Sequence, residues 1–454
     1  MSVTPRNLAL KAINSLDNGT GFPDQYLKAA FLRYPHLSER DRAFAVNLVQ
    51  GTLRWRLRID WVIGQAVRFP FRKIEPLVLN ILRIGLYQIL FMDRVPESAA
   101  VDEAVKQAKG FGRRHVAGFV NGILRNVCRQ KHSIAFPERE TDSVRYLSVF
   151  YSYPAWLVKK WIREVGLGLT EQLLAAGNEI PGLVIRTNTL KIDRPGLIKH
   201  LDQEGLTGRP TRYSPDGVEL EGLKGPVSGL KSFKEGLFQV QGEAAQMCSY
   251  FFSPSPGDRI LDICAGLGGK STHVAQLIGD SGFILALDMN YNRLVSLKSS
   301  SRRLGTGSIR TVVADAAGDL SSLLHSSFDK IIVDAPCSAL GTISKHPDGK
   351  WTKNEGDIER LSILQRKILN SAAPLLREGG KMLYLTCTIS RQENEDMVSG
   401  FLKENRHMEL GDLKDRVPEW GMGLIDDHGF FRTYPHVNGM DGFFGALLIK
   451  KSNT

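Results

Sequence analysis

The sequence predicts a multidomain protein with three parts: an all-α bundle over residues 1–140, a small α/β linker or insert domain over 141–245, and an α/β domain with a mostly parallel sheet over 246–454. Three observations carry this prediction. Apolar residues recur at helical spacing through the first part, short strands and helices mix between prolines and glycines in the second, and apolar strands alternate with helices in the third. At 454 residues the chain is long enough for two or three cores.

The composition, with 42% hydrophobic and 24% charged residues, is that of an ordinary globular protein. The first residues lack the apolar core of a signal peptide, and no run of about 18 apolar residues occurs. The nearest candidate, residues 77–92, is interrupted by Asn80, Arg83 and Gln88, so a buried helix is predicted there. We therefore expect a cytoplasmic protein that does not use a membrane.

The chain has five cysteines, an odd number that cannot all pair. They form no Cys-x-x-Cys pair and no zinc-binding spacing, so free thiols in a reducing compartment and no bound metal are expected. The five are Cys128, Cys248, Cys264, Cys337 and Cys387.

The pattern of the first part predicts helices almost throughout. Ser38 and Asp41 precede an apolar-periodic run over residues 44–53, and Ser38 is expected to cap that helix. Residues 101–109 and 117–128 continue the helical spacing. Because no Asn-Gly hairpin with flanking alternation occurs, the first part is predicted to be a helical bundle.

Positive charge is concentrated in this first part. The net charge of the whole chain is +11, and residues 1–140 hold 22 Lys and Arg against 12 Asp and Glu, or +10. Such an excess favours a polyanionic partner, because neutralising phosphates releases counterions. A solvated basic face without function is the alternative. The clusters at 54–58 (Arg-Trp-Arg-Leu-Arg) and 113–115 (Arg-Arg-His) favour RNA.

The middle part is the least regular. Residues 154–157 are predicted to start a helix, and residues 183–188 and 236–241 are predicted strands. Proline and glycine punctuate the remainder. We expect a small α/β insert that joins the bundle to the last domain and helps to hold RNA.

In the third part, one apolar run delivers reactive groups to a strand end. Residues 328–333 are predicted to form a buried strand that Pro336 prevents from continuing, so Asp334 and Cys337 lie at its carboxyl end. The carboxyl ends of strands are where open α/β sheets bind ligands.

A second run repeats this arrangement. A turn is predicted at Gly379-Gly380, and the strand that follows over residues 381–386 ends at Cys387. Each cysteine alone is compatible with a small buried hydrophobe. Two cysteines at equivalent strand ends favour a chemical role.

The first strand of this part, residues 259–263, runs into a glycine-rich turn over residues 264–270, where backbone N–H groups can approach a polar or anionic ligand. A nucleoside triphosphatase loop would need Gly at position 264, where Cys stands. The dinucleotide fingerprint started at Gly266 would need Gly at position 271, where Ser stands. The turn alone therefore indicates a ligand without identifying it.

Acidic residues end the following strands. Residues 283–287 lead to Asp288, about 20 residues beyond the glycines, a spacing that suits a ribose with both hydroxyls free. The next strand leads to Asp315, and the one after it to Asp334. Each alone could be a solvated loop start. In this order, after a glycine-rich first turn, they resemble the Rossmann-like S-adenosylmethionine-dependent methyltransferase fold.

If the cofactor donates a methyl group, a pyrimidine acceptor must first be made nucleophilic. A thiolate that adds to carbon 6 makes carbon 5 enamine-like; methyl transfer, loss of the carbon-5 proton and expulsion of the thiolate follow. Two cysteines fit this sequence of steps, one to attack and one to assist proton removal and release.

The first part resembles the NusB-type RNA-binding domain over about residues 5–130. The matching segments, in order, are Asp41-Arg42-Ala43, Gly51-Thr52-Leu53-Arg54, Leu82-Arg83-Ile84-Gly85-Leu86-Tyr87-Gln88, Val95-Pro96-Glu97-Ser98-Ala99-Ala100-Val101 and Phe119-Val120-Asn121-Gly122-Ile123-Leu124-Arg125.

The third part resembles the RNA cytosine-5 methyltransferase family, and the whole chain is similar to its bacterial 16S ribosomal RNA members. The matching segments are Asp334-Ala335-Pro336-Cys337-Ser338, His346-Pro347-Asp348, Lys350-Trp351, Thr386-Cys387-Thr388, Glu393-Asn394-Glu395 and Asp441-Gly442-Phe443-Phe444.

The resemblance implies roles for individual residues. Cys387 would be the nucleophile, Cys337 would assist product release, and Asp334 would face both the cofactor and the target cytosine. S-adenosyl-L-methionine would be the cofactor, and 16S rRNA or a small-subunit assembly intermediate would be the partner of a monomeric enzyme. The implied cofactor residues are Cys264, Ala265, Gly266, Leu267, Gly268, Gly269, Lys270, Asp288, Arg293, Asp315 and Asp334.

Two positions depart from the family pattern. The loop usually contains Ala-Pro where Gly266-Leu267 stands, and the usual Gln-Asp before the first helix of the domain is Gln241-Gly242 here. Loss of the proline frees the turn and is expected to loosen cofactor binding. Neither change affects a thiol or an acidic contact.

Three alternative functions fit the pattern of residues to different degrees. The same chemistry could act on transfer RNA or on another rRNA site, or the chain could be a non-catalytic NusB-like assembly factor, although such a scaffold would not need both thiols. An adenine amino-methyltransferase would be expected to have Asp/Asn-Pro-Pro-aromatic at 334–337, and the ring that would stack on a flipped adenine is missing. A cytosine target must also be single-stranded or extruded.

Overall fold

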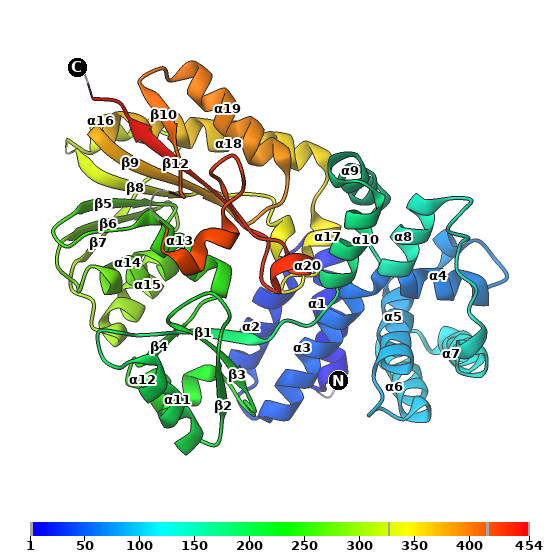
Figure 1. Ribbon diagram of the computed structural model, residues 1–454. Coiled ribbons are helices and arrows are strands. Elements are labelled where there is room, and N and C mark those ends of the chain that lie inside the picture. Colours follow the sequence, from blue (N-terminus) through cyan, green and yellow to red (C-terminus); the bar gives the residue numbers. More distant parts are fainter. Residues whose placement is uncertain (1–2, 326, 415–416, 453–454) are drawn as a thin grey trace. The chain divides into compact units, whose positions relative to one another are not determined.

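The computed structural model describes residues 3–325, 327–414 and 417–452 (Figure 1). The chain divides into two compact units. The helical unit comprises residues up to Asn178 together with His346–Thr352, and the sheet unit comprises Glu179–Lys345 and the chain from Lys353 onward. The predicted fold class is confirmed: a helical domain, a small α/β insert and a Rossmann-like domain follow one another. The predicted boundaries at 140 and 245 stay predictions.

The helical unit consists of short helices around one apolar core. Its helices are α1 (Pro5–Asp17), α2 (Pro23–Arg33), α3 (Glu39–Arg54), α4 (Arg56–Ala66), α5 (Pro76–Phe91), α6 (Glu97–Gly110), α7 (Ala117–Gln130), α8 (Ser143–Tyr151), α9 (Ala155–Val165), α10 (Leu167–Ala176) and α17 (Gly349–Thr352). The Ser38 side chain caps α3 by accepting a hydrogen bond from the Asp41 N–H at 3.1 Å, as predicted. Helix α5 is buried along most of its length, also as predicted.

The basic cluster at residues 54–58 makes its contacts within the helical unit. Arg54 is buried, and Arg56 forms an ion pair with Asp17 at 2.8 Å. The Arg58 guanidinium lies over the rings of Phe136 and Phe150, 4.7 and 4.6 Å from their centroids. The expectation that residues 54–58 present their charge to RNA is therefore wrong: apolar neighbours surround these long side chains, whose stems pack well in a core.

The second basic cluster, at 113–115, is only partly involved in contacts within the protein. The Arg113 side chain donates to the Glu75 carboxylate, with Nε 2.7 Å from Oε2. Its side chain remains 35% exposed. The side chain of Arg114 lies outside what the structure describes. An RNA contact here stays a prediction.

A short segment between two stretches of the sheet unit belongs to the helical unit. Lys350 is fully buried there, and its Nζ donates to Asn178 Oδ1 at 2.6 Å and to the carbonyls of Arg54 and Ser152. Trp351 Nε1 donates to the Leu53 carbonyl at 2.7 Å. The Lys-Trp pair recognised in the sequence therefore anchors the chain within the helical unit.

Residues 141–178 of the predicted insert lie in the helical unit. The rest of it, called the insert from here on, begins the sheet unit and has a four-stranded antiparallel sheet of order β2-β3-β1-β4. Its elements are β1 (Leu183–Thr187), α11 (Arg194–Gln203), β2 (Thr207–Pro210), β3 (Gly217–Glu221), α12 (Lys231–Lys234) and β4 (Phe238–Val240). Strands β1 and β4 correspond to the two predicted strands. They pair directly with each other, which places residues far apart in the sequence side by side.

The remainder of the sheet unit is built on a sheet of order β10-β12-β9-β8-β5-β6-β7, with β11 paired to β12. Strands β5 to β9 run parallel, whereas β12 and β10 run antiparallel. Its elements are α13 (Glu243–Phe252), β5 (Arg259–Ile263), α14 (Gly269–Leu277), β6 (Phe283–Asp288), α15 (Tyr291–Leu304), β7 (Ile309–Val313), α16 (Leu320–Leu323), β8 (Phe328–Asp334), α18 (Glu355–Ala372), β9 (Leu376–Thr386), α19 (Glu395–Glu404), β10 (Met408–Gly411), β11 (Phe431–Arg432), α20 (Pro435–Asn438) and β12 (Phe444–Lys450).

Helices cover both faces of this sheet (Figure 1). Because side chains alternate along a strand, β8 sends Ile331 to the layer under α18 and α19 and Ile332 to the layer under α13 and α14. The strands are therefore apolar on both faces, which is why the sequence shows continuous apolar runs instead of alternation.

The prediction of a turn at Gly379-Gly380 is wrong. Both residues lie inside β9, which begins at Leu376. The pairing of β9 with β8 shifts register between Phe328 and Lys330, and Gly379 has a φ of +67°. Left-handed glycine thus produces an irregular stretch inside one strand where the sequence suggests a boundary.

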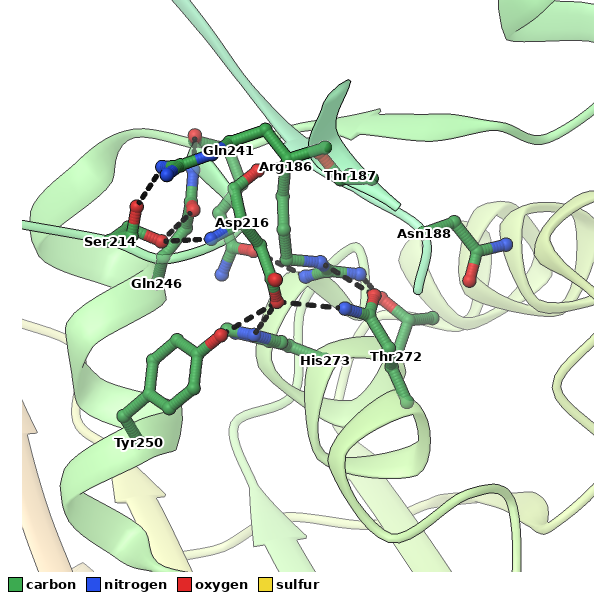
Figure 2. A network of polar contacts seen from close by, with 12 residues as sticks. Arg186, Thr187, Asn188, Ser214, Asp216, Gln241, Gln246, Tyr250, Thr272 and His273 are labelled. Atoms are coloured by element: carbon green, nitrogen blue, oxygen red, sulfur yellow. Dashed lines mark hydrogen bonds and ion pairs between the residues drawn. The ribbon is translucent and has the colours of Figure 1, made fainter. Parts of the chain in front are cut away.

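A buried polar network joins the insert to α13 and α14 (Figure 2). Asp216 of the insert accepts hydrogen bonds from Tyr250 Oη at 2.7 Å and from Gln276 Nε2 at 3.0 Å. The fully buried His273 places Nε2 3.7 Å from the same carboxylate. Ser214 donates to Gln246 Oε1 at 2.6 Å. The hydrogen bonds of Asp216 and Ser214 fix one orientation of the two sheets.

Among the described residues, no helix is both long and apolar enough to cross a membrane. The same residues contain no group of three or more His, Cys, Asp or Glu side chains placed to hold a metal ion.

The buried imidazole predicts a pH dependence of stability. Burial lowers the pKa of His273 to about 4 from an ordinary value of 6.5. Between pH 6.5 and 4 the unfolded chain binds a proton that the folded chain excludes, so the free energy of unfolding falls as the pH falls through this window. The contribution approaches about 1.4 kcal/mol per pH unit.

We expect His273→Gln to flatten the pH dependence in this window, measured by urea unfolding at pH 6.5, 5.5 and 4.5. The exposed His428 provides the control, and His428→Gln should keep the wild-type slope. Equal slopes for wild type and His273→Gln would show that this imidazole does not titrate on unfolding.

Candidate active site

A cavity of about 580 Å³ lies at the carboxyl ends of the parallel strands. Open α/β sheets bind their ligands at this edge, in the crevice outside the carboxyl ends of the strands. Its lining residues are Gln241, Ala245, Cys264, Ala265, Gly266, Leu267, Gly269, Lys270, Leu287, Asp288, Met289, Arg293, Asp315, Ala316, Asp334, Ala335, Pro336, Cys337, Leu364, Ile368 and Cys387.

Two thiols from neighbouring strands meet in this cavity. Cys337 follows β8 and Cys387 follows β9, and their sulfur atoms are 3.3 Å apart. The Cys387 N–H also donates to Cys337 Sγ at 3.3 Å. Both cysteines are free and partly exposed. The hydrogen bond with Cys387, together with burial, raises the pKa of the Cys337 thiol well above its ordinary value, so Cys337 keeps its proton at neutral pH.

A buried carboxylate holds the two turns together. Glu393 is fully buried, and its Oε1 accepts from the Ser338 N–H at 2.8 Å and from Gln365 Nε2 at 3.1 Å. Its Oε2 accepts from Ser338 Oγ at 2.5 Å. Ser338 Oγ also lies 2.8 Å from Thr388 Oγ1. Glu393 therefore holds Ser338, the residue after Cys337, and Ser338 in turn contacts Thr388, the residue after Cys387.

Further hydrogen bonds fix the end of β9. Thr386 Oγ1 donates to Asn394 Oδ1 at 2.6 Å, and Asn394 Nδ2 donates to the Thr388 carbonyl at 3.0 Å. The Gly341 N–H donates to the Cys387 carbonyl at 3.0 Å. Asn394 thus contacts the residues on both sides of Cys387, and these bonds fix the backbone that carries its thiol.

The glycine-rich turn between β5 and α14 adopts a conformation with three left-handed residues. Cys264, Gly266 and Gly268 have φ of +63°, +58° and +80°. A Cβ at position 268 would lie 2.4 Å from Leu297 Cγ, so this position needs glycine for packing as well as for conformation. The Gly266 N–H donates to Asp288 Oδ2 at 2.9 Å. This bond ties the turn to the end of β6.

Lys270 and Asp334 form an ion pair in the floor of the cavity, with Nζ 2.6 Å from Oδ2. Burial by itself lowers the pKa of Lys270, but the ion pair with Asp334 and the attraction of other acidic neighbours, Asp262 among them, together outweigh burial and raise it. Lys270 therefore stays a cation that orients Asp334. Burial, reinforced by Asp334 and Asp288, raises the pKa of Cys264 to about 12, so its thiol is not a nucleophile.

The structure brings together all the site residues predicted from the sequence except Gly268, which shapes the turn from behind the cavity wall. Sequence reasoning missed the positioning role of Glu393, although it recognised the segment 393–395. It also missed the α18 side chains Leu364 and Ile368, which line the cavity. The helical spacing of α18 gives no signal that distinguishes these two from ordinary core residues.

A Rossmann-like sheet, a glycine-rich first turn and acidic strand ends around one cavity define the class of α/β methyltransferases, here preceded by a helical domain. Family models agree with this class along the chain. Residues 249–449 match 16S rRNA methyltransferase RsmB/F, residues 3–129 match the NusB family, and residues 153–227 match the RsmF/B-like ferredoxin-like domain.

Curated relatives cover nearly the whole chain. It is 33% identical over 447 residues to the probable ribosomal RNA small subunit methyltransferase B of Bacillus subtilis, covering 98% of both chains. It is also 33% identical over 417 residues to ribosomal RNA small subunit methyltransferase B of Salmonella newport, covering 91% of this chain and 92% of the relative. The chain therefore belongs to the ribosomal RNA small subunit methyltransferase B family.

Two solved structures are similar to this chain in fold. The crystal structure of PH0851 superposes with a TM-score of 0.81 at 27% identity, covering 99% of this chain and all of that one. NSun6 from Pyrococcus horikoshii, solved with SFG, superposes with a TM-score of 0.59 at 26% identity and covers 67% of this chain.

The environments of the cysteines predict an order of thiol modification. Cys387 and Cys337 both line the cavity, but the hydrogen bond with Cys387 and burial raise the pKa of Cys337. Cys248 is fully buried, and burial raises its pKa to about 12. Because the thiolate is the reactive form, iodoacetamide at pH 7.5 should modify Cys387 before Cys337 and leave Cys248 intact until unfolding. Peptide mapping by mass spectrometry gives the order, and first modification at Cys337 would contradict it.

Proposed function

We propose that this protein transfers a methyl group from S-adenosyl-L-methionine to carbon 5 of a cytidine in 16S rRNA, through a covalent bond between Cys387 and carbon 6. The observation that carries this proposal is the pair of thiols, 3.3 Å apart, in the cavity at the ends of β8 and β9. Methyl transfer to an oxygen or to an exocyclic nitrogen would need neither thiol.

The cavity fits the proposed cofactor. Its volume of about 580 Å³ is that of a typical small-molecule site. Asp288 stands at the end of β6, where a carboxylate can accept hydrogen bonds from ribose hydroxyls. Arg293 and Asp315 line the same cavity. The relative NSun6 was solved with SFG, an analogue of S-adenosylmethionine, which supports the same ligand class. When bound, the cofactor supplies the methyl group.

The two cysteines divide the protein's part of the reaction. Cys337 retains its proton and lies within hydrogen-bond distance of Cys387 Sγ, at 3.3 Å, which leaves Cys387 as the attacking sulfur. Addition of the thiolate to carbon 6 places electron density on carbon 5, where the methyl group is received. Loss of the carbon-5 proton to water restores the double bond between carbons 5 and 6 and breaks the bond from carbon 6 to Cys387 Sγ. The Cys337 S–H assists this release by donating a hydrogen bond to the departing Cys387 thiolate. Asp334, oriented by Lys270, faces the reacting ring.

The choice of RNA rests on the family. Relatives in this family are named for the small ribosomal subunit, and the first part matches the NusB family. The cytosine must leave any duplex to expose carbon 6. We propose 16S rRNA, free or in a small-subunit assembly intermediate, as the substrate of a monomeric cytoplasmic enzyme that needs no metal. Transfer RNA is the principal alternative substrate.

Single cysteine variants test both thiol roles. Wild type, Cys387→Ala and Cys337→Ala are incubated with unmodified 16S rRNA and methyl-labelled S-adenosylmethionine, then separated on denaturing gels. We expect Cys387→Ala to lose methylation, because no nucleophile remains. Cys337→Ala should accumulate a labelled protein–RNA adduct, because product release is impaired.

Cys128→Ala is the matched control, since Cys128 lies in α7 of the helical unit, and it should methylate at the wild-type rate. Normal methylation by Cys387→Ala would exclude it as the nucleophile. Label in transfer RNA but not in 16S rRNA would identify transfer RNA as the substrate. Absence of label in any RNA would favour a non-catalytic assembly factor.

A further inference from the structure

Arg186 of the insert reaches the cofactor turn of the methyltransferase domain. It lies on β1, and its side chain is only 1% exposed. The guanidinium donates through Nη1 to the Gly269 carbonyl at 2.9 Å and to Gln241 Oε1, and through Nη2 to Thr272 Oγ1 at 3.2 Å. Its Nε donates to Gln276 Oε1 at 3.2 Å. Figure 2 shows the side chain pointing from the insert toward the first turn of α14.

Two of these acceptors form the cavity wall. Gly269 and Gln241 both line the cavity. Thr272 extends the contact, because its hydroxyl donates to the Gly268 carbonyl at 2.7 Å while accepting from Arg186. Through these bonds, one side chain fixes the end of the glycine-rich turn, the start of α14 and the neighbouring Gln241.

The turn requires such support from outside. Three of its residues have left-handed φ, and one of them, Cys264, is not a glycine. Backbone of this kind persists only where the surroundings hold it. Leu267, at the tip of the turn, is 61% exposed and therefore contributes little packing. The support must come from the buried side, where Arg186 lies.

Arginine suits this position better than other residues. Its planar fork presents five N–H donors in a fixed geometry, so it can bind several acceptors at once, whereas lysine cannot reproduce that arrangement. The acceptors within hydrogen-bond distance are neutral. Burial lowers the pKa of Arg186 to about 9, which still leaves it charged at neutral pH.

We infer that Arg186 is a positioning residue through which the insert holds the glycine-rich turn and Gln241 in the conformation that binds the cofactor. This inference rests on the proposed function. The insert thus contributes to cofactor affinity without touching the cofactor.

The test compares Arg186→Met with Arg303→Met. Arg303 on α15 donates to the carbonyls of Phe233 and Phe238, both at 2.9 Å, so it also joins the insert to the methyltransferase domain but does not contact the turn. The measurements are the dissociation constant of sinefungin by titration calorimetry and the melting temperature of each full-length protein.

Arg186→Met should raise the dissociation constant about tenfold, the change expected when only about a tenth of the molecules keep a binding-competent turn. Arg303→Met should lower the melting temperature comparably but leave the constant within about twofold of wild type. In turnover assays Arg186→Met should raise KM for S-adenosylmethionine while kcat at saturation stays near wild type. An equal loss of affinity in both variants, or wild-type affinity in Arg186→Met, would overturn the inference.

Thr272→Val keeps the inference testable if Arg186→Met does not fold. This isosteric change removes the hydroxyl that bridges Arg186 and Gly268, and it should weaken sinefungin binding about threefold on the same population argument. Unchanged affinity in Thr272→Val would count against the positioning role. Failure of the wild-type protein to bind sinefungin would instead overturn the proposed cofactor.

Discussion

The close approach of two sulfur atoms is the constraint on which the rest of the site depends. Cys337 and Cys387 are 50 residues apart in the chain, and their sulfurs are 3.3 Å apart only because β8 and β9 are neighbouring parallel strands that end at the same level. Glu393 then holds Ser338, which follows Cys337, and Ser338 contacts Thr388, which follows Cys387. Its carboxylate is buried and accepts several hydrogen bonds, as a buried charged group must if its burial is not to destabilise the fold.

Two buried cations, Lys270 and Arg186, hold the backbone around the cavity. In the floor of the cavity Lys270 pairs with Asp334, and beneath the glycine-rich turn Arg186 binds neutral acceptors. Both cations hold flexible or strained segments in one conformation. The loop between β5 and α14 lacks the proline that would restrict it, and its geometry therefore depends on neighbours in the insert. Part of the predicted linker domain, Gln241, thus lines the cavity, and Arg186 contacts its wall.

Much of the fold was predictable because local patterns decided it. The helix cap at Ser38, the buried helix α5 and the strands ending at Asp288, Asp334 and Cys387 all follow from spacing, capping and apolar runs. The failures have a common cause. The arginines at 54–58 predict an exposed basic patch, but in the fold aromatic rings and Asp17 contact them. Gly379-Gly380 predicts a turn, but pairing with β8 places both residues inside a strand. In each case a tertiary contact outweighs the local signal.

The sequence by itself determined the order of the three parts, the positions of the strand ends and the chemical groups placed there, because these depend on residues that are close together in the chain. Only the tertiary structure decided which of those groups meet. The pairing of Cys337 with Cys387, the role of Glu393 and the contact of Arg186 with Gly269 arise from strand order and from packing between segments 50 or more residues apart. Such contacts leave no local pattern, since the free energy that forms them comes from burying side chains of distant elements together.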